Sequence, residues 1–582
     1  MILVILLRFL LAAMLGNTIN SHAAYDDAWF VNASYLRDYL GSESPWSMIK
    51  NPSFFLFLGF VRLSRLPFWF WTSLLWSAAA GLTWPILRRF TKNRILLSAG
   101  FIFLLFCPIA FDYRAGLKIY RAAFMAPWLC LFFESCLLLA FECWNNRKIS
   151  LARFLLALFL MSLTYPAALL AKEDGIWLVC VLGFTVLLCL AGLIFQMFRS
   201  SRQNRALGLG QAGSAFLKVL MAASLLLPWG AGRLAEQQIR EMNHKAFGVD
   251  LINWRTQGEI AKFASLVYQI DSDSRTKDYW AATDALNRAI EVSKTLQSRP
   301  ALVDKIHHSS FYNLDEEQIA GDFLPWVILS AYQLSGEWTG GADAQTFFAA
   351  VNQEIEDAFD QGTLARQKGR FFLTHSAGSR SFEEILQLGP YIRTTLQGSI
   401  FLDGYKTSGK PSISDDERTF ERARQTTHEN LFDEAEKNEH PYLWKNRTFA
   451  NRISEGIFWF YRIANPLLLG AGFLFWCCQL ICWIMKRRTD YSVACLLIAI
   501  FCLLGIWFVY IAAVSWFSEF IFREDGITDW AKSILAFYSA GGLTLQYLAE
   551  LLAAVLIFRT AKAFRKKPAA NSNLTGKIKS GV

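Results

Sequence analysis

Carboxylates stand directly after several apolar segments of this chain. They are Asp26-Asp27 after the first segment, Asp112 after the third and Glu173-Asp174 after the fifth. If successive segments cross a membrane, all three positions lie at the same membrane face. Cations accompany them in the sequence, namely Arg114, Arg121 and Lys172. Charges of both signs at several span ends indicate a shared polar site, which is typical of a membrane enzyme acting at the outer surface.

The composition is that of an integral membrane protein. Hydrophobic residues make up 54% of the chain and charged residues only 18%, which is too apolar for an ordinary soluble protein of this length. The net charge of +10 does not indicate nucleic-acid binding, because the basic residues fall in short loops between apolar segments. All eleven cysteines lie in apolar segments without CxxC or Cys/His metal spacing, so we expect small buried or lipid-facing side chains.

Apolar segments of sufficient length predict about ten membrane-spanning helices. They lie near 2–20, 67–87, 95–112, 122–143, 153–171, 175–198, 217–234, 456–485, 491–514 and 531–558. Lys/Arg clusters at 88–94, 147–153, 199–205, 486–488 and 559–567 follow the even-numbered segments. These clusters place the even-numbered ends, and both termini, in the cytoplasm. The polar segment 235–455 is then outside.

The predicted fold is an all-α polytopic membrane protein. Residues 1–234 form a seven-span module with a large first outer loop at 21–66, and residues 54–61 suit an interfacial helix. Residues 235–455 form a mainly helical outer domain, with helical periodicity at 281–296 and 346–359. Residues 456–560 add three spans, and 561–582 form a basic cytoplasmic tail expected to be disordered. We expect the first segment to be an uncleaved helix. The alternative is a signal peptide that is cleaved after Ala23.

A family resemblance rests on short runs in the first 235 residues. They are Tyr25-Asp26-Asp27-Ala28-Trp29-Phe30, Lys50-Asn51-Pro52-Ser53-Phe54-Phe55-Leu56-Phe57-Leu58, Arg114, Ile119-Tyr120-Arg121 and Lys172-Glu173-Asp174-Gly175-Ile176-Trp177. This series resembles the bacterial GT-C class, integral-membrane glycosyltransferases that use polyprenyl-phosphate sugars. Where such proteins carry Arg-Glu-Glu before the glycine, this chain has Lys172-Glu173-Asp174, so the bidentate geometry of arginine is lost.

The resemblance implies sugar transfer from a polyprenyl-phosphate donor to an envelope glycan or lipid acceptor, at the outer face of a bacterial inner membrane. A carboxylate would take the proton of the acceptor hydroxyl, and cations would stabilise the departing phosphate. Asp26 or Asp27 is the expected base, with Asp27 preferred. The donor phosphate is assigned to Arg114, Lys118, Arg121 and Lys172, of which the first three would share one helical face. Glu173, Asp174, Asp112 and Lys50 would support the site.

A purely structural role is the alternative interpretation of the same residues. Asp26-Asp27 or Asp174 could cap the helix that follows, and Arg523-Glu524-Asp525-Gly526-Ile527 repeats that local pattern. No metal site is assigned, although a divalent cation, Mg²⁺ or Mn²⁺, between Asp26-Asp27 and Glu173 is left open. His307-His308 predicts a solvated turn, and Glu134, in mid-span, predicts a buried structural hydrogen bond.

Two functions of other classes stay open at this point. A transporter or flippase of lipid-linked glycans would need a polar path through the membrane, and an inverted repeat, which is not found, would favour it. A non-catalytic envelope assembly protein would tolerate alanine at Asp26, Asp27 and Glu173. A glycan polymerase or ligase is a further variant of the enzyme reading.

Overall fold

The computed structural model describes residues 1–22, 26–144, 149–203, 211–309, 312–313, 318–374, 377–407, 411–486, 491–521 and 527–565. These residues form almost only helices, and their two short strands, β1 (Tyr312–Asn313) and β2 (Gln318–Ile319), pair antiparallel. The predicted cleavage site after Ala23, the Glu524-Asp525-Gly526 repeat and most of the C-terminal tail lie outside the described residues. The all-α prediction is confirmed for the part of the chain described here.

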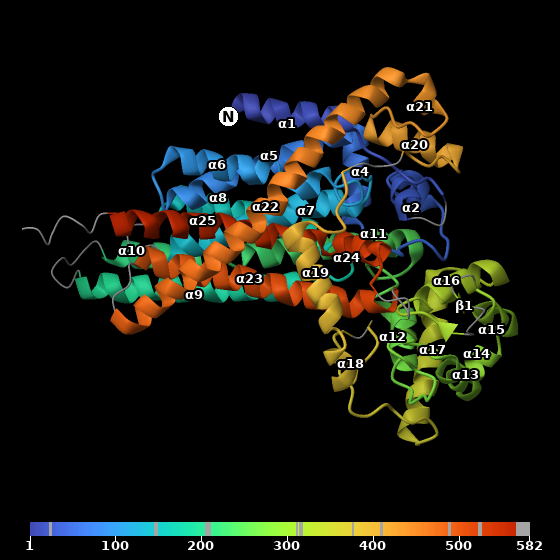
Figure 1. The fold of residues 1–582 in the computed structure, drawn as a ribbon. Helices are drawn as coiled ribbons and strands as arrows, with labels where there is room; N and C mark the ends of the chain where they lie inside the picture. Colours follow the sequence, from blue (N-terminus) through green and yellow to red (C-terminus); the bar gives the residue numbers. More distant parts are fainter. Residues whose placement is uncertain are drawn as a thin grey trace, which may run out of the picture.

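A bundle of long helices makes up most of the molecule (Figure 1). Its members are α1 (Ile2–Leu15), α5 (Phe68–Arg88), α6 (Arg94–Leu105), α7 (Arg121–Cys143), α8 (Leu151–Leu169), α9 (Ile176–Gln203), α10 (Gln211–Ser224), α11 (Leu227–Phe247), α22 (Pro441–Lys486), α23 (Tyr491–Ser518) and α25 (Leu543–Arg565). Among the described residues, eight helical segments are long and apolar enough to cross a membrane. A multi-pass membrane protein is therefore indicated.

The remaining two of the ten predicted spans differ from the prediction. α5 lies where the second was predicted, but it qualifies as a span only together with α4 (Ser53–Ser64), from which it is bent by 111°. α1 has 14 residues and ends before Gly16, whose φ of +58° is left-handed. At about 1.5 Å per residue, α1 is shorter than the hydrocarbon core of about 30 Å. A glycine that stops the helix is the physical reason for this difference.

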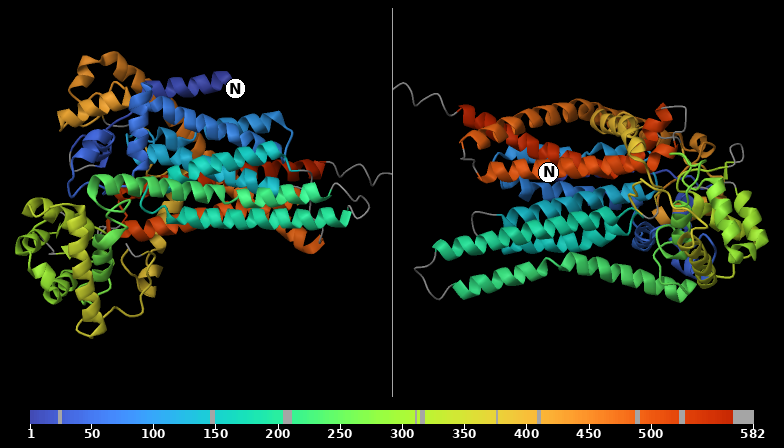
Figure 2. Two further views of the ribbon diagram at one scale, coloured as in Figure 1. Left: turned by 180° about the vertical axis from the view of Figure 1, so that it is seen from behind. Right: turned by 90° about the horizontal axis from the view of Figure 1, so that it is seen from below.

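Different parts of the chain lie at the two ends of the helix bundle. The C-terminal end of α25 and the facing ends of α9 and α10 lie at one end, away from the helices of residues 258–360 (Figures 1 and 2). α22 runs unbroken for 46 residues from Pro441, so it crosses the predicted domain boundary at 455/456.

A second apolar core lies at the opposite end, in a body we call the outer body. Its helices are α12 (Gly258–Val267), α13 (Thr283–Val292), α14 (Lys294–Gln297), α15 (Pro300–His307), α16 (Leu324–Ser335) and α17 (Gly341–Asp360). Trp254, Trp280 and Phe348 are fully buried in this core. Met48 and Phe520 join the same core from the first outer loop and from η2 (Glu519–Ile521), so both segments fix the outer body to the bundle.

Shorter helices connect the outer body with the bundle. They are α2 (Asp26–Ala33), α3 (Leu36–Gly41), η1 (Pro108–Phe111), α18 (Phe382–Leu386), α19 (Gly389–Phe401), α20 (Glu417–Thr427), α21 (Glu436–Glu439), α24 (Asp529–Ser539) and η3 (Ala540–Gly542). α20 packs on α2 and α4, and α19 packs on α22, α23 and α24. α4 buries Phe54, Phe55 and Leu58 and exposes Leu63, as an interfacial helix would.

Three smaller predictions are settled by burial and hydrogen bonding. The periodicities at 281–296 and 346–359 are helical, in α13, α14 and α17. His308 is exposed at the end of α15, where a solvated turn was predicted. Glu134 is fully buried on α7, but its carboxyl has no hydrogen-bond partner within the described residues. The predicted structural hydrogen bond of Glu134 is therefore wrong for this part of the chain.

Candidate functional site

The first outer loop and the start of α7 bring Asp26 against two polar groups. Lys50 Nζ lies 3.0 Å from Asp26 Oδ2, and the Tyr120 hydroxyl donates a hydrogen bond to the same oxygen at 2.9 Å. The Asp26 side chain is 29% exposed, whereas that of Lys50 is 4% exposed. Burial raises the pKa of Asp26, but Lys50 and Arg121 outweigh it and leave the pKa below its ordinary value. Asp26 is therefore an accessible, ionised carboxylate.

Asp27 has different surroundings although it is the next residue. Its side chain is 1% exposed, and its carboxylate pairs with Lys118 Nζ at 2.9 Å. The backbone N–H of Asn20 donates to its other oxygen at 3.0 Å. Burial raises the pKa of Asp27 against the opposing effects of Lys118 and the Asn20 hydrogen bond. Successive residues of α2 thus point in different directions, and only Asp26 is open to a substrate.

An ion pair between Arg121 and Glu173 joins the first turn of α7 to the loop between α8 and α9. Arg121 Nη1 lies 2.7 Å and 2.9 Å from the two carboxylate oxygens of Glu173. The N–H of Asn51 donates to the same carboxylate at 3.1 Å, and Arg255 Nη1 is 3.8 Å away. Burial alone would raise the pKa of Glu173, but Arg121 and Arg255 hold it well below the ordinary value.

The loop that carries Glu173 is constrained on both sides. Lys172 Nζ pairs with Asp174 Oδ2 at 2.7 Å, and the Asp174 side chain is 36% exposed. At Gly175, a Cβ atom would lie 2.5 Å from the carbonyl oxygen of Leu169, so a side chain would displace backbone. A glycine in this position lets the chain turn tightly between α8 and α9. The turn places Lys172, Glu173 and Asp174 in the loop that faces Arg121 at the start of α7.

The predicted shared helical face of Arg114, Lys118 and Arg121 is wrong. Residues 112–120 form a loop, and α7 begins only at Arg121. This loop pairs with the N-terminal segment, since Thr18 N–H donates to the Leu117 carbonyl and Ile119 N–H donates to the Thr18 carbonyl, both at 2.8 Å. Lys118 and Arg121 still reach the site, each through a different carboxylate.

Asp112 organises this loop. Its carboxylate accepts the backbone N–H groups of Arg114 at 3.0 Å, Ala115 at 2.7 Å and Lys406 at 2.8 Å. The guanidinium of Arg114 donates to the hydroxyl of Tyr113 at 2.7 Å. Asp112 therefore ties the loop to the segment that follows α19, which is a structural role.

Partners from the outer body complete the site, and the sequence did not point to them. Arg255 pairs with Asp322 as well as with Glu173. The Trp326 ring lies 4.5 Å from Lys50 Nζ and 5.7 Å from the guanidinium of Arg255. No local pattern marks Arg255, Asp322 or Trp326, because Arg255 is 82 residues from Glu173 in sequence and Trp326 is 276 residues from Lys50. Tyr120 was within a run quoted for the resemblance, but its hydroxyl was not assigned a role.

The carboxylates considered for a divalent cation face cations instead. Asp26 pairs with Lys50, Asp27 with Lys118 and Glu173 with Arg121. Within the described ranges, no group of three or more His, Cys, Asp or Glu side chains has the arrangement of a metal site. The side chains at this position therefore do not fit a metal ion.

A polar groove of about 610 Å³ lies between the first outer loop and α20. Its walls include Asn32, Arg37, Asp38, Asp416, Arg418 and Arg422. Asn32 is near the end of α2, the helix that begins at Asp26, so the groove begins about 10 Å along that helix from the carboxylate.

No protein-family model, no curated protein and no solved structure matches this chain.

Proposed function

We propose that this protein is a GT-C-class glycosyltransferase that transfers a sugar from a polyprenyl-phosphate donor to an envelope glycan or lipid acceptor. The reaction takes place at the outer face of a bacterial inner membrane, with the C-terminus in the cytoplasm. One observation carries the proposal: the accessible carboxylate of Asp26 lies at one end of an apolar helix bundle, beside Lys50 and near the Arg121–Glu173 pair. A base beside cations is what transfer from a lipid phosphate requires.

Asp26 is the general base in this proposal. It accepts the proton of an acceptor hydroxyl, and the hydroxyl oxygen forms a bond to the anomeric carbon of the donor sugar. The bond between that carbon and the phosphate oxygen breaks, and the phosphate retains the electron pair. Lys50 and Lys172 stabilise the added negative charge, while phosphate needs no strong acid to leave. The accessibility of Asp26 and the burial of Asp27 favour Asp26, in place of the earlier preference for Asp27.

The groove beside α20 suits the acceptor. Its lining includes amide, carboxylate, guanidinium and hydroxyl groups, which are groups that bind sugar hydroxyls. The lipid tail of the donor would enter from the side of the bundle, and the acceptor from the aqueous groove, so that the two meet at Asp26.

A transporter of lipid-linked glycans is the second candidate, because two carboxyl groups lie inside the bundle. Glu134 on α7 and Glu550 on α25 are both fully buried. Ionisable residues within a membrane often mark a transport or proton pathway. Such a transporter would move substrate across vesicle membranes and would form no new glycosidic bond.

The test is sugar transfer by the purified protein in detergent, with a panel of radiolabelled polyprenyl-phosphate sugars and an envelope extract as acceptor. Asp26→Asn should lower the kcat of the folded, normally eluting protein by about 10²- to 10⁴-fold, and it should also cost some thermal stability because the Lys50 side chain, which is 4% exposed, loses its ion-pair partner. Asp27→Asn should lower stability too, because Lys118 loses a buried partner, but it should reduce the kcat of the folded protein far less than Asp26→Asn does. Asp343→Asn, on the surface of α17, is the matched control and should leave transfer unchanged. Wild-type transfer that survives Asp26→Asn would refute the proposed base.

A further inference from the structure

An exposed apolar surface lies on the segment before α19, and we call it the apolar foot. It consists of Phe371, Phe372, Leu373, Phe382 and Leu386. Phe382 and Leu386 are 64% and 65% exposed, and both belong to the short helix α18. Large apolar side chains gathered in one exposed place mark a surface that another apolar phase covers.

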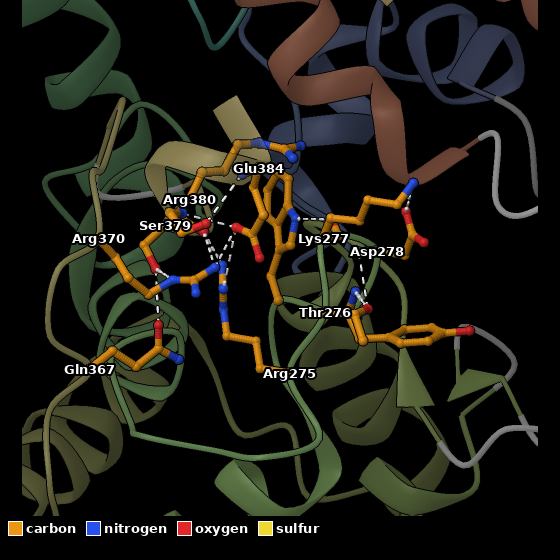
Figure 3. A network of polar contacts seen from close by, with 12 residues as sticks. Arg275, Thr276, Lys277, Asp278, Gln367, Arg370, Ser379, Arg380 and Glu384 are labelled. Carbon is orange, nitrogen blue, oxygen red and sulfur yellow. Dashed lines mark hydrogen bonds and ion pairs between the residues drawn. The ribbon is translucent and has the colours of Figure 1, made fainter. Parts of the chain in front are cut away.

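Hydrogen bonds fix the two halves of the apolar foot to each other. The backbone N–H and carbonyl of Phe371 pair with those of Arg380, each at 2.8 Å. Ser381 caps α18 by accepting the N–H of Glu384 at 3.2 Å, and the Glu384 carboxylate accepts the N–H of Ser381 in return. Arg370 donates to the hydroxyl and the carbonyl of Ser379, so the segment has a defined conformation (Figure 3).

Arg380 then fixes the apolar foot to the end of a membrane span. Its guanidinium is fully buried, pairs with the carboxylate of Glu519 and donates to the Trp516 carbonyl at 2.9 Å. Trp516 is in the last turn of α23, and Glu519 begins η2 directly after it. Lys277 Nζ also reaches Glu519 at 3.6 Å. Arg380 therefore connects the apolar foot to the end of the apolar helix α23.

The neighbouring helices agree with this placement. α19, which follows α18 after two residues, packs on α22, α23 and α24. α18 lies on the side of the outer body that is nearer the bundle (Figures 1 and 2). Lys368 and Arg393, on either side of the apolar foot in sequence, are exposed. Cations beside apolar side chains complement the phosphates of a lipid surface.

We propose that the apolar foot inserts into the outer-leaflet interface and holds the outer body against the lipid bilayer. This contact is additional to the membrane-spanning helices. It gives the polar site a fixed height above the lipid, because Arg380 connects the foot to α23 and the outer body contributes Arg255 to the site. The proposal stands whether or not Asp26 is a catalytic base.

Photo-crosslinking in vesicles tests the contact directly. The full-length protein would carry p-benzoylphenylalanine at position 382 or 386 and be reconstituted into mixed phosphatidylethanolamine and phosphatidylglycerol vesicles. An aromatic replacement at these exposed positions keeps the side chain apolar, so folding is preserved. The same probe at Leu334, an exposed leucine on α16 of the outer body, is the matched control.

Mass spectrometry of the illuminated protein identifies what the probe has contacted. We expect phospholipid adducts at positions 382 and 386, at a yield at least about tenfold above that at position 334. Adducts to a second copy of the chain would identify a protein interface and overturn the proposal. Equal lipid labelling at all three positions, or no lipid adduct at 382 and 386, would also overturn it.

Discussion

The Arg121–Glu173 pair permits a test that needs neither donor nor acceptor. Arg121→Met removes the guanidinium and leaves a carboxylate whose side chain is 8% exposed. Removing one partner of a buried ion pair costs about 3–5 kcal/mol. Because the Asn51 N–H and Arg255 still face Glu173, we expect a loss near the lower end, about 3 kcal/mol. The double variant Arg121→Met/Glu173→Gln buries no unpaired charge, so the coupling free energy should be about 2 kcal/mol.

The pH dependence of this coupling follows from the direction of the pKa shift. The pKa of Glu173 is held well below its ordinary value in the folded protein by Arg121 and Arg255, against the effect of burial. A carboxylate with a lowered folded pKa contributes stability above its unfolded pKa of about 4.3 and loses it as the pH falls further. The coupling should therefore be constant near neutral pH and decline below about pH 4.

Reversible unfolding in mixed detergent and sodium dodecyl sulfate micelles, followed by circular dichroism, measures each free energy of unfolding. Arg422 and Asp38 provide the matched control cycle, because their 2.6 Å ion pair is at the surface, with the Asp38 side chain 55% exposed. A surface pair should couple by less than about 1 kcal/mol. If the Arg121–Glu173 coupling is no larger than this control, the description of a desolvated pair at the site is wrong.

Three further substitutions should change thermal stability, its pH dependence or the rate of tryptic cleavage. Asp112→Asn should destabilise the protein by about 1–3 kcal/mol in thermal unfolding, because the NH₂ group of the new asparagine would face a backbone N–H that the carboxylate now accepts. An unchanged unfolding midpoint would contradict this. Burial raises the pKa of Glu429 to about 7. The stability contribution of Glu429 is thus present at acid pH and lost as the pH rises through about 7, so Glu429→Gln should flatten the pH profile of thermal stability; a profile of wild-type shape would contradict this. Arg380→Met should speed tryptic cleavage within residues 366–393, since Glu519 loses its partner, and an unchanged cleavage rate would show that the pair does not hold this segment.

Local sequence accounts for much of the bundle. Long apolar runs give helices that are long and apolar enough to cross a membrane at eight of the ten predicted positions, because a membrane requires backbone hydrogen bonds to be satisfied within each segment. The exceptions depend on single residues or on geometry: Gly16 ends α1, and a sharp bend separates α4 from α5. The meeting of Asp26, Arg121 and Glu173 was also predictable in outline, since alternate span ends share one face.

The detailed contacts of the site were not predictable from local patterns. Residues 114–120 are not helical because this loop pairs with Thr18, about 100 residues away in sequence, and because the Asp112 carboxylate binds the N–H groups of Arg114, Ala115 and Lys406. The choice between Asp26 and Asp27 depends on where that loop places Lys118. Arg255 reaches Glu173 only because the outer body folds back onto the bundle end.

The balance of charges at the site limits how an anionic donor could bind. The ion pairs connect five cations with five carboxylates, namely Lys50, Lys118, Arg121, Lys172 and Arg255 with Asp26, Asp27, Glu173, Asp174 and Asp322. A phosphate adds negative charge, so its binding is favourable only where a cation exchanges a carboxylate for a phosphate oxygen. Asp26 and Asp174 are the most exposed of these carboxylates, and their partners are lysines, whose flexible side chains can change partner. We therefore expect a phosphate to reach Lys50 and Lys172 first, while Arg121 and Glu173 stay paired and hold the loops in place.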